Sequence, residues 1–220
     1  MSYVVAIVGG SGRTGREVTR QLLARGDDVL CIVRDPAKGA ELEQLGVEVV
    51  RLDLETSSLN DFAGTFVGCD AVVFAAGMGA DGSFETVDHL GSKKAVDAAK
   101  RAGVQRFVQI SALGASAEAL PESSIGGNWD AYFEAKRAAD AYLRDSGLDY
   151  TILEPGELSD DAPTGRISLE PSQLEHTTLP RFDLATTIRA VLDSRGAIGK
   201  TWQVGGGDDI IATAIASRSE

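Results

Sequence analysis

Residues 4–35 read VVAIVGGSGRTGREVTRQLLARGDDVLCIVRD, and this stretch decides the fold. An apolar run is followed by a glycine-rich turn, by a stretch with apolar residues at helical spacing and by a second apolar run. Short runs that are apolar almost throughout are typical of parallel strands buried on both faces. The stretch therefore predicts a strand, a tight turn, a helix and a second strand parallel to the first.

The same alternation continues along the chain. Apolar, β-branched runs predict strands at Tyr3–Val8, Asp28–Val33, Val47–Leu52, Ala71–Ala75, Arg106–Ser111, Tyr150–Glu154 and Thr201–Val204. Apolar residues three and four apart predict helices at Arg13–Arg25, Pro36–Leu45, Ser58–Phe66, Thr86–Ala102, Trp129–Ser146 and Leu184–Ser194. This order predicts an α/β fold, with a doubly wound parallel sheet flanked by helices. The polar, proline-containing stretch Leu158–Pro180 is expected to be an irregular loop that either covers a ligand or is plain surface.

The composition is that of one globular domain with an acidic surface. The chain has 220 residues, of which 43% are hydrophobic, enough for one core. It carries 21 Lys and Arg against 33 Asp and Glu, a net charge of −12. This balance repels nucleic acids and anionic membrane surfaces. We therefore expect a small-molecule substrate, no nucleic-acid or membrane partner, and a monomer or small homo-oligomer.

The cysteines and the N-terminus bear on the compartment. Cys31 and Cys69 lie in or beside apolar runs and have no spacing typical of metal binding or of a disulfide framework. We expect both to be reduced core residues, and we expect no metal site. The sequence shows no signal-peptide pattern and no apolar run of membrane-spanning length. These features predict a soluble, cytoplasmic protein.

The glycine-rich turn predicts a dinucleotide site. Gly9, Gly12 and Gly15 are spaced by three, and Gly10 completes a Gly-x-Gly-x-x-Gly pattern with the last two. A pyrophosphate needs close approach to the backbone and free N–H groups at a helix N-terminus, and side chains would obstruct both. Placed between the first strand and the first helix, the pattern favours dinucleotide binding over a purely structural turn. The expected binding residues are Gly9, Gly10, Ser11, Gly12, Arg13, Thr14 and Gly15.

The end of the second strand bears on which dinucleotide binds. A carboxylate there usually bonds the ribose 2′-hydroxyl of NAD, whereas an Arg accommodates the 2′-phosphate of NADP. Arg34 occupies the tip, and Arg13 and Lys38 are expected to add positive charge to the same phosphate. Asp35 would argue for NAD if its side chain faced the ribose. The sequence therefore favours NADP, with NAD as the alternative.

Taken in order, these motifs resemble the short-chain dehydrogenase/reductase superfamily, in particular its atypical single-domain members in the NAD(P)H-binding, NmrA-like and biliverdin-reductase-B-like group. The resemblance also rests on AGVQRFVQISALGAS (102–116), YFEAKRAADAYLRDSGLDYTILEPGEL (132–158) and RFDLATTIRAVLD (181–193). It implies one Rossmann-type NAD(P)-binding domain over residues 1–220, with a small substrate-side region around 156–181. It further implies that Asp53 and Leu54 flank the adenine, that Ala75, Ala76 and Gly77 run under the ribose, and that Ser111, Tyr132, Lys136 and Pro155 surround the nicotinamide.

Three of these residues suit proton transfer on physical grounds. Tyr132 and Lys136 are four apart on one predicted helix, hence on one face, and Ser111 ends a strand at the carboxyl edge of the sheet. An ammonium near the phenol is expected to lower its pKa, and Ser111 is expected to orient a carbonyl oxygen. Lys136 would also hold the nicotinamide ribose. The alternative is that Tyr132 packs as a core aromatic with no chemical role.

Two positions depart from the family pattern. The usual Asn has no counterpart in VDHLGSKKAVDAAK (87–100), and Glu154 in LEPGEL (153–158) stands where these relatives have an Arg. His89 and His176 are weak candidates, because a lone His is more often solvated or structurally bonded.

The leading interpretation is an NADP-dependent reductase that transfers hydride to a small carbonyl, quinone or flavin-like acceptor. One alternative is an NADP-binding redox sensor or regulatory protein without catalysis. Another is a nucleotide-sugar epimerase-like isomerase, which the short sequence after Pro155 disfavours because little chain is left for a sugar-binding domain.

Overall fold

The computed structural model describes residues 2–77, 83–116, 129–174 and 177–219. Its main sheet has eight strands in the order β3-β2-β1-β4-β5-β6-β10-β8. Six of them follow the chain order of the apolar runs: β1 (Val4–Val8), β2 (Asp28–Val33), β3 (Glu48–Arg51), β4 (Ala71–Phe74), β5 (Arg106–Ile110) and β6 (Asp149–Pro155). These pair in parallel, as does β10 (Lys200–Ile210) with β6, whereas β8 (Arg166–Glu170) runs antiparallel to β10. The predicted doubly wound sheet is confirmed.

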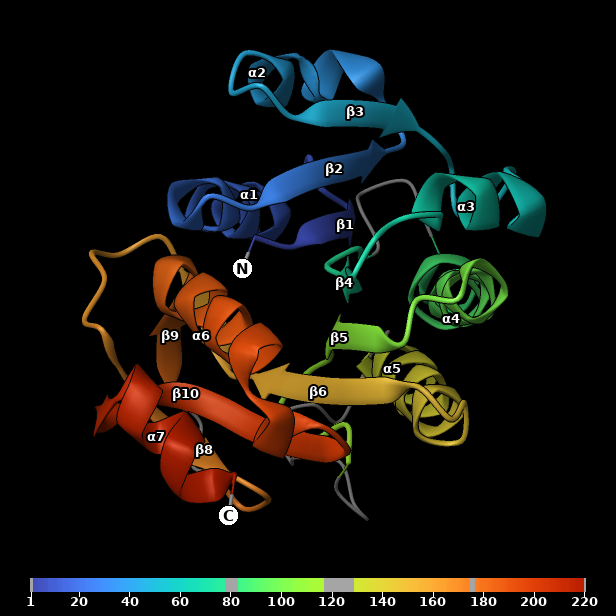
Figure 1. The fold of residues 1–220 in the computed structure, drawn as a ribbon. Coiled ribbons are helices and arrows are strands. Elements are labelled where there is room, and N and C mark those ends of the chain that lie inside the picture. Colours follow the sequence, from blue (N-terminus) through green and yellow to red (C-terminus); the bar gives the residue numbers. More distant parts are fainter. Residues whose placement is uncertain (1, 78–82, 117–128, 175–176, 220) are drawn as a thin grey trace.

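Helices cover both faces of the sheet, as Figure 1 shows. One face carries α1 (Arg13–Arg25), α6 (Arg181–Asp193) and α7 (Ile211–Arg218), and the other carries α3 (Leu59–Phe66), α4 (Ser92–Ala102) and α5 (Trp129–Arg144). Successive residues of each strand alternate between these faces, so Val5 and Ile7 join the core under α1 and α6 while Ala6 and Val8 join the core under α3 to α5.

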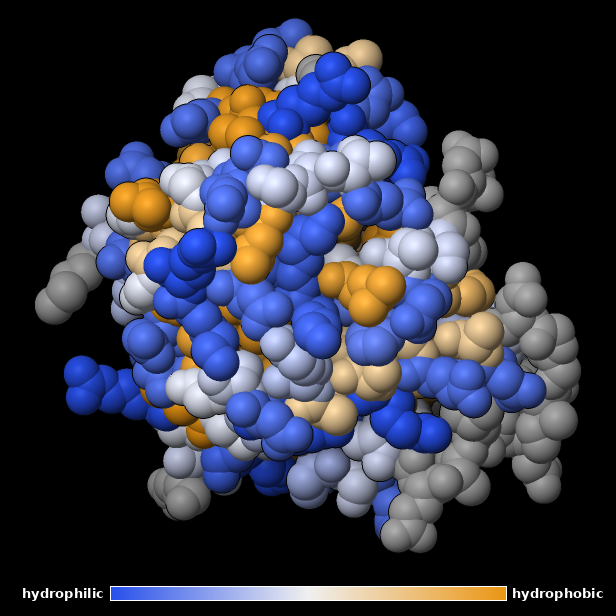
Figure 2. All heavy atoms as spheres, turned by 90° about the vertical axis from the view of Figure 1, so that its right-hand side faces the viewer, coloured by the Kyte–Doolittle hydropathy of each residue, from blue (hydrophilic) through white to orange (hydrophobic). Residues whose placement is uncertain are grey.

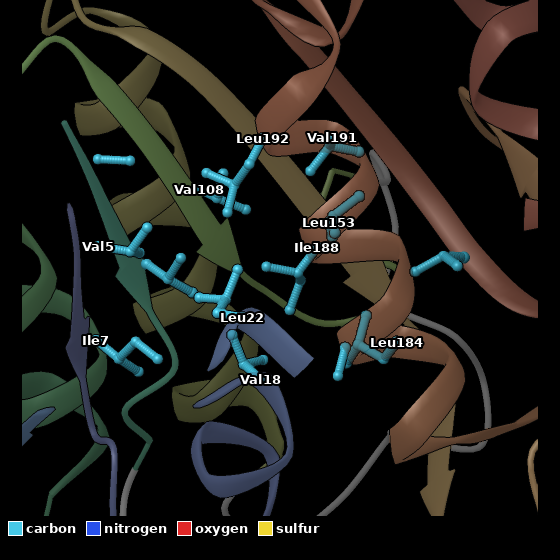
Figure 3. Close-up of a cluster of buried hydrophobic side chains, with 14 of the residues drawn as sticks. Val5, Ile7, Val18, Leu22, Val108, Leu153, Leu184, Ile188, Val191 and Leu192 are labelled. Atoms are coloured by element: carbon cyan, nitrogen blue, oxygen red, sulfur yellow. The ribbon is translucent and has the colours of Figure 1, made fainter. Parts of the chain in front are cut away.

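Figure 3 shows the first of these cores, where Val18 and Leu22 of α1 meet Leu184 and Ile188 of α6 over the strands. All four are fully buried. On the opposite side of the molecule, hydrophilic side chains cover most of the surface over α3, α4 and α5, and the hydrophobic ones between them are scattered (Figure 2). None of the helices within the described ranges is long and apolar enough to cross a membrane.

Several predicted boundaries change in the structure. The stretch predicted as one helix from residue 36 divides into a 3₁₀ turn (Pro36–Lys38) and a short α2 (Ala40–Glu43). The helix predicted from Thr86 begins instead with a π-helical segment, η2 (Phe84–Gly91), which leads into α4. Gly26 and Gly103 end α1 and α4 in the left-handed conformation, with φ of 92° and 79°.

The prediction that Leu158–Pro180 is irregular was wrong in part. The stretch contains β8 and the short strand β9 (Thr178–Pro180), which pairs in parallel with β7 (Glu157–Ser159) in a second, two-stranded sheet. A short 3₁₀ turn, η4 (Arg195–Ala197), lies between α6 and β10, and β10 runs on to Ile210. Neither β8 nor α7 was predicted. Both depend on packing against β10 and α6 rather than on a strong local pattern.

Candidate dinucleotide site

A pocket of about 180 Å³ opens at the carboxyl ends of β1 and β4, where the strand order reverses. Ligands of open α/β sheets bind at such a switch point. The pocket brings together ten of the residues predicted from sequence: Gly9, Ser11, Gly12, Arg34, Lys38, Asp53, Leu54, Ala75, Ala76 and Gly77. The segments that contribute them are far apart in sequence, so the fold assembles this half of the predicted site.

The glycines allow three backbone segments to approach closely. A Cβ on Gly9, where φ is 86°, would lie 2.7 Å from the Cα of Ala76. A Cβ on Gly15 would lie 2.3 Å from the carbonyl oxygen of Gly9, and one on Gly10 would lie 2.7 Å from the Sγ of Cys31. Gly10 and Gly15 therefore let α1 and β2 pack on the turn, and they do not line the pocket.

Gly12 has a different role from the other three glycines. Its φ of −68° and ψ of 160° suit any residue, and a Cβ there would meet only the Gly9 carbonyl oxygen, at 3.2 Å. Gly12 is the N-cap of α1 and it lines the pocket. The open space at this residue and the helix N-terminus behind it form the kind of cradle that a pyrophosphate requires.

The rim of the pocket carries two exposed cations, Arg34 and Lys38. Asp35 also lines it, but its Oδ1 accepts a hydrogen bond from the backbone N–H of Ala37 at 3.0 Å. The carboxylate thus caps the turn that follows β2.

Arg13 does not join these two cations. Its guanidinium pairs with Asp160 at 3.2 Å, with side chains 73% and 66% exposed, and it lines a separate groove with Arg181. The expectation that Arg13 adds charge at the same place as Arg34 and Lys38 is not met in this structure. Thr14 is also not among the residues that line the pocket.

Lys136 lies farther along the carboxyl edge of the sheet and is buried. Its Nζ is 2.9 Å from Oδ1 of Asp88 and donates to the carbonyl oxygen of Ile110 at 3.3 Å. Burial by itself lowers the pKa of Lys136, but the charges of Asp88, Tyr132 and Asp140 and the hydrogen bond to Asp88 together outweigh it, so this pKa lies above its ordinary value. Lys136 is therefore an ammonium held in place.

Asp88 was missed by sequence reasoning, which searched its helix for an Asn. A carboxylate oxygen accepts hydrogen bonds as the side-chain oxygen of an Asn does. An Asp in the segment VDHLGSKKAVDAAK could therefore have been recognised from the sequence as a substitute for the missing Asn. It sits in η2, and a Cβ on Gly77 would lie 3.5 Å from its Oδ1. Asp88 thus lies between Lys136 and the turn after β4 that lines the pocket.

Ser111 is buried and donates its hydroxyl hydrogen to Oδ2 of Asp140 at 2.5 Å. The other oxygen of Asp140 accepts from Nε2 of Gln109 at 2.5 Å, and Oε1 of Gln109 accepts from the hydroxyl of Ser92. Burial raises the pKa of Asp140, although its hydrogen bonds with Ser111 and Gln109 oppose this. Sequence reasoning missed Asp140, which lies one helical turn after Lys136.

The ring of Tyr132 belongs to an aromatic cluster at the N-terminal end of α5. Its centroid lies 5.2 Å from that of Phe84, 5.8 Å from that of Trp129 and 5.3 Å from that of Phe133. The Nζ of Lys136 is 5.8 Å from the ring centroid. Burial raises the pKa of Tyr132, and the ammonium only partly offsets this. Lys136 thus lowers the pKa of the phenol as expected, but burial outweighs this effect, so the pKa of Tyr132 lies above its ordinary value instead of nearer to neutral pH.

Glu154 and Pro155 end β6 and both are buried. The pairing of β5, β6 and β10 places Ser111, Glu154 and Gln203 side by side. Oε2 of Glu154 accepts from the hydroxyl of Ser116 at 3.0 Å and from Nε2 of Gln203 at 3.4 Å. Burial raises the pKa of Glu154. A buried carboxyl group thus occupies the place of the expected cation.

The remaining histidine and cysteine candidates that the structure describes lie in surroundings that indicate structural roles. Nδ1 of His89 lies 3.0 Å from Glu85, one turn earlier, and His176 lies outside the described residues. Cys31 is fully buried, and burial raises its pKa to about 11, as expected for an unreactive core thiol. Cys69 is partly buried against the second core.

The chain is similar to known proteins over nearly its whole length. The model of a family described as NAD(P)H-binding matches residues 9–195. A Bacillus subtilis protein named as an uncharacterised sugar epimerase, YhfK, is 34% identical over 96% of this chain and 98% of its own length. The photosystem II assembly factor Ycf39 of Synechocystis is 30% identical over 68% of this chain and 43% of its own length.

Solved structures show the same fold. A protein from Bacillus halodurans, provisionally assigned as an NAD-dependent epimerase/dehydratase, superimposes with a TM-score of 0.87 at 33% identity and covers 98% of this chain and 100% of its own. The oxidoreductase ylbE from Lactococcus lactis gives a TM-score of 0.83 at 30% identity, covering 97% of this chain and 95% of its own.

Proposed function

The chain belongs to the NAD(P)H-binding family, and from this premise we propose that it is an NADP-dependent oxidoreductase that reduces a small carbonyl, quinone or flavin-like acceptor. One observation carries the proposal: a single pocket joins the glycine turn at the α1 N-terminus to two exposed cations, Arg34 and Lys38. The cradle suits a pyrophosphate and the cations suit a 2′-phosphate. NADP is therefore the cofactor that these residues favour, with NAD as the alternative.

Bound there, the cofactor would supply a hydride from its nicotinamide. The chain's own contribution begins with Lys136, whose ammonium is held by Asp88 and by the Ile110 carbonyl at the carboxyl edge of the sheet. From this position it is proposed to donate hydrogen bonds to the nicotinamide ribose. Ser111 directly follows β5 and Pro155 ends the neighbouring β6, and both are proposed to border the nicotinamide and the acceptor.

Tyr132 is the proposed proton donor for a carbonyl acceptor. The phenol is protonated at neutral pH, which is the form that a donor needs, but its raised pKa makes it a weaker acid than an ordinary tyrosine, so the proposal depends on its position and not on its acidity. Ser111 cannot share that role easily, because its hydroxyl hydrogen is used by Asp140. For an acceptor that takes hydride alone, water supplies the proton and the Tyr132 ring acts only in packing.

An epimerase-like isomerase is the second candidate, since the names of YhfK and of the Bacillus halodurans protein point to it. Against it, most of the chain after Pro155 completes the main sheet and its helices, as β8, α6, β10 and α7 do. We assign residues 156–181, with the two-stranded β7–β9 sheet, to the substrate side. A nucleotide sugar would need more protein around it than this region offers.

The test combines cofactor binding with turnover. NADPH and NADH are titrated by nicotinamide fluorescence, and NADPH oxidation is followed with quinones, flavins and aldehydes as acceptors. Tighter NADPH binding with turnover of one acceptor class supports the proposal. NADPH binding with no turnover of any acceptor would favour a redox sensor, and interconversion of a UDP-sugar by protein purified with bound cofactor would favour the isomerase.

A further inference from the structure

Arg16 connects the two phosphate-binding segments of the pocket. Its Nε donates to the carbonyl oxygen of Ser11 in the glycine turn at 3.0 Å, and its NH2 donates to the carbonyl oxygen of Lys38 at 2.9 Å. Its NH1 pairs with Glu41 of α2 at 2.5 Å. All three nitrogens of one guanidinium are thus used to hold the turn after β1 against the segment after β2. Arg16 itself does not line the pocket and faces a groove on its outer side.

The two segments do not depend on Arg16 equally. The glycine turn has further anchors, because the N–H groups of Gly9 and Gly10 donate to the Ile32 carbonyl at 3.1 and 3.2 Å, and that of Gly12 donates to the Gly9 carbonyl at 3.0 Å. In the segment 36–44, by contrast, the other hydrogen bonds found in the described part of the chain stay between residues 35 and 47. Leu42 of this segment packs into the core that contains Val18 and Leu22, and Arg16 adds the hydrogen-bonded link between Lys38 and the glycine turn in the described residues.

We propose that Arg16 is a positioning residue for NADP selectivity, which it exerts by setting the distance between the pyrophosphate turn and Lys38, one of the two cations proposed to bind the 2′-phosphate. This inference rests on the proposed NADP preference. Pyrophosphate and 2′-phosphate belong to one dinucleotide, so Lys38 contributes to binding only when its distance from the glycine turn matches the distance between these two groups. In the ion pair between Arg16 and Glu41 the carboxylate is exposed, so this pair contributes little. The proposed positioning of Lys38 therefore depends on the hydrogen bonds from Arg16 to the carbonyl oxygens of Ser11 and Lys38.

The test compares Arg16→Gln with Arg20→Gln. Arg20 lies one turn later on the same helix, and within the described part of the chain its ion pair is with the neighbouring Glu17, at 3.4 Å. NADPH and NADH affinities are measured by fluorescence titration for both variants and for wild type. For Arg16→Gln we expect NADPH affinity to fall about tenfold and NADH affinity by about twofold or less. Arg20→Gln should leave both unchanged.

Each other outcome is decisive. A wild-type protein that binds NADH as tightly as NADPH removes the proposed cofactor preference before any variant is compared. A wild-type protein that prefers NADPH, with an Arg16→Gln variant that weakens both dinucleotides equally or neither, overturns the role of Arg16 alone. Should Arg16→Gln unfold, Arg16→Lys, which can reach one carbonyl but not both, is measured instead with the same expected loss of the NADPH to NADH ratio.

Discussion

Replacing Gly12 by Val separates the binding role of the glycine turn from its structural role. The backbone at Gly12 is extended, with φ of −68°, and a Cβ there meets only the Gly9 carbonyl oxygen at 3.2 Å. A branched side chain is therefore accommodated with a shift of a few tenths of an ångström. Because Gly is also a better N-cap than Val, we expect Gly12→Val to lower the free energy of unfolding by about 1 kcal/mol.

Dinucleotide binding should respond far more strongly. Gly12 lines the pocket beside the first N–H groups of α1, so the Val methyl groups would occupy the space of the pyrophosphate. A hydrogen bond to a charged group contributes about 1.5–3 kcal/mol, so losing one weakens binding by about 10- to 100-fold and losing two weakens it by about 100-fold or more. NADPH and NADH should be affected alike, since both carry the pyrophosphate.

Gly15→Ala provides the contrast and Gly64→Ala the control. A Cβ on Gly15 would lie 2.3 Å from the Gly9 carbonyl oxygen, so α1 must move from β1 and we expect a loss of about 2–3 kcal/mol of stability. Gly64 is exposed on α3 with open space around it, and Ala there should be neutral or slightly stabilising. Urea unfolding and nicotinamide fluorescence measure the two quantities. A folded Gly12→Val variant with unchanged NADPH affinity would refute the assignment of this turn to the pyrophosphate.

Three further predictions concern single side chains. Arg34→Ala should weaken NADPH binding by about 10- to 100-fold and leave NADH nearly unchanged, and equal effects in titrations of the two cofactors would contradict a 2′-phosphate contact. Tyr132→Phe should lower kcat with a carbonyl acceptor by about 100-fold and leave NADPH affinity unchanged, whereas Lys136→Ala should lower both kcat and NADPH affinity. A kcat of the Tyr132→Phe variant within a few-fold of wild type would show that the phenol takes no part in the reaction. Because burial raises the pKa of Glu154, the folded protein binds this proton more tightly than the unfolded chain, so this carboxyl destabilises the fold as pH rises through its folded pKa. Glu154→Gln should therefore reduce the loss of stability that urea unfolding shows as pH rises above about 4.5, and an unchanged pH dependence would show that the carboxyl is solvated.

The sequence by itself determined the parallel part of the sheet and the nucleotide half of the site. Strands buried on both faces appear as apolar runs, as at Val4–Val8, and the glycine turn and Arg34 follow their strands directly in sequence. In such a fold the carboxyl ends of neighbouring parallel strands meet at one edge. The local order of residues therefore predicted that Gly12, Arg34 and Ala75 line one pocket.

Tertiary structure alone decided the other half of the site and the C-terminal end of the sheet. The ion pair between Asp88 and Lys136 and the hydrogen bond from Ser111 to Asp140 form only when the helices pack on the sheet. The raised pKa of Tyr132 likewise depends on its burial in that packing. In β10, a Cβ on Gly207 would lie 2.4 Å from the Ser168 backbone nitrogen of β8. Such close approach between segments that are distant in sequence requires glycine. The glycines of β10 in turn weaken the apolar, β-branched pattern by which a strand is predicted, so only the packing reveals the full strand.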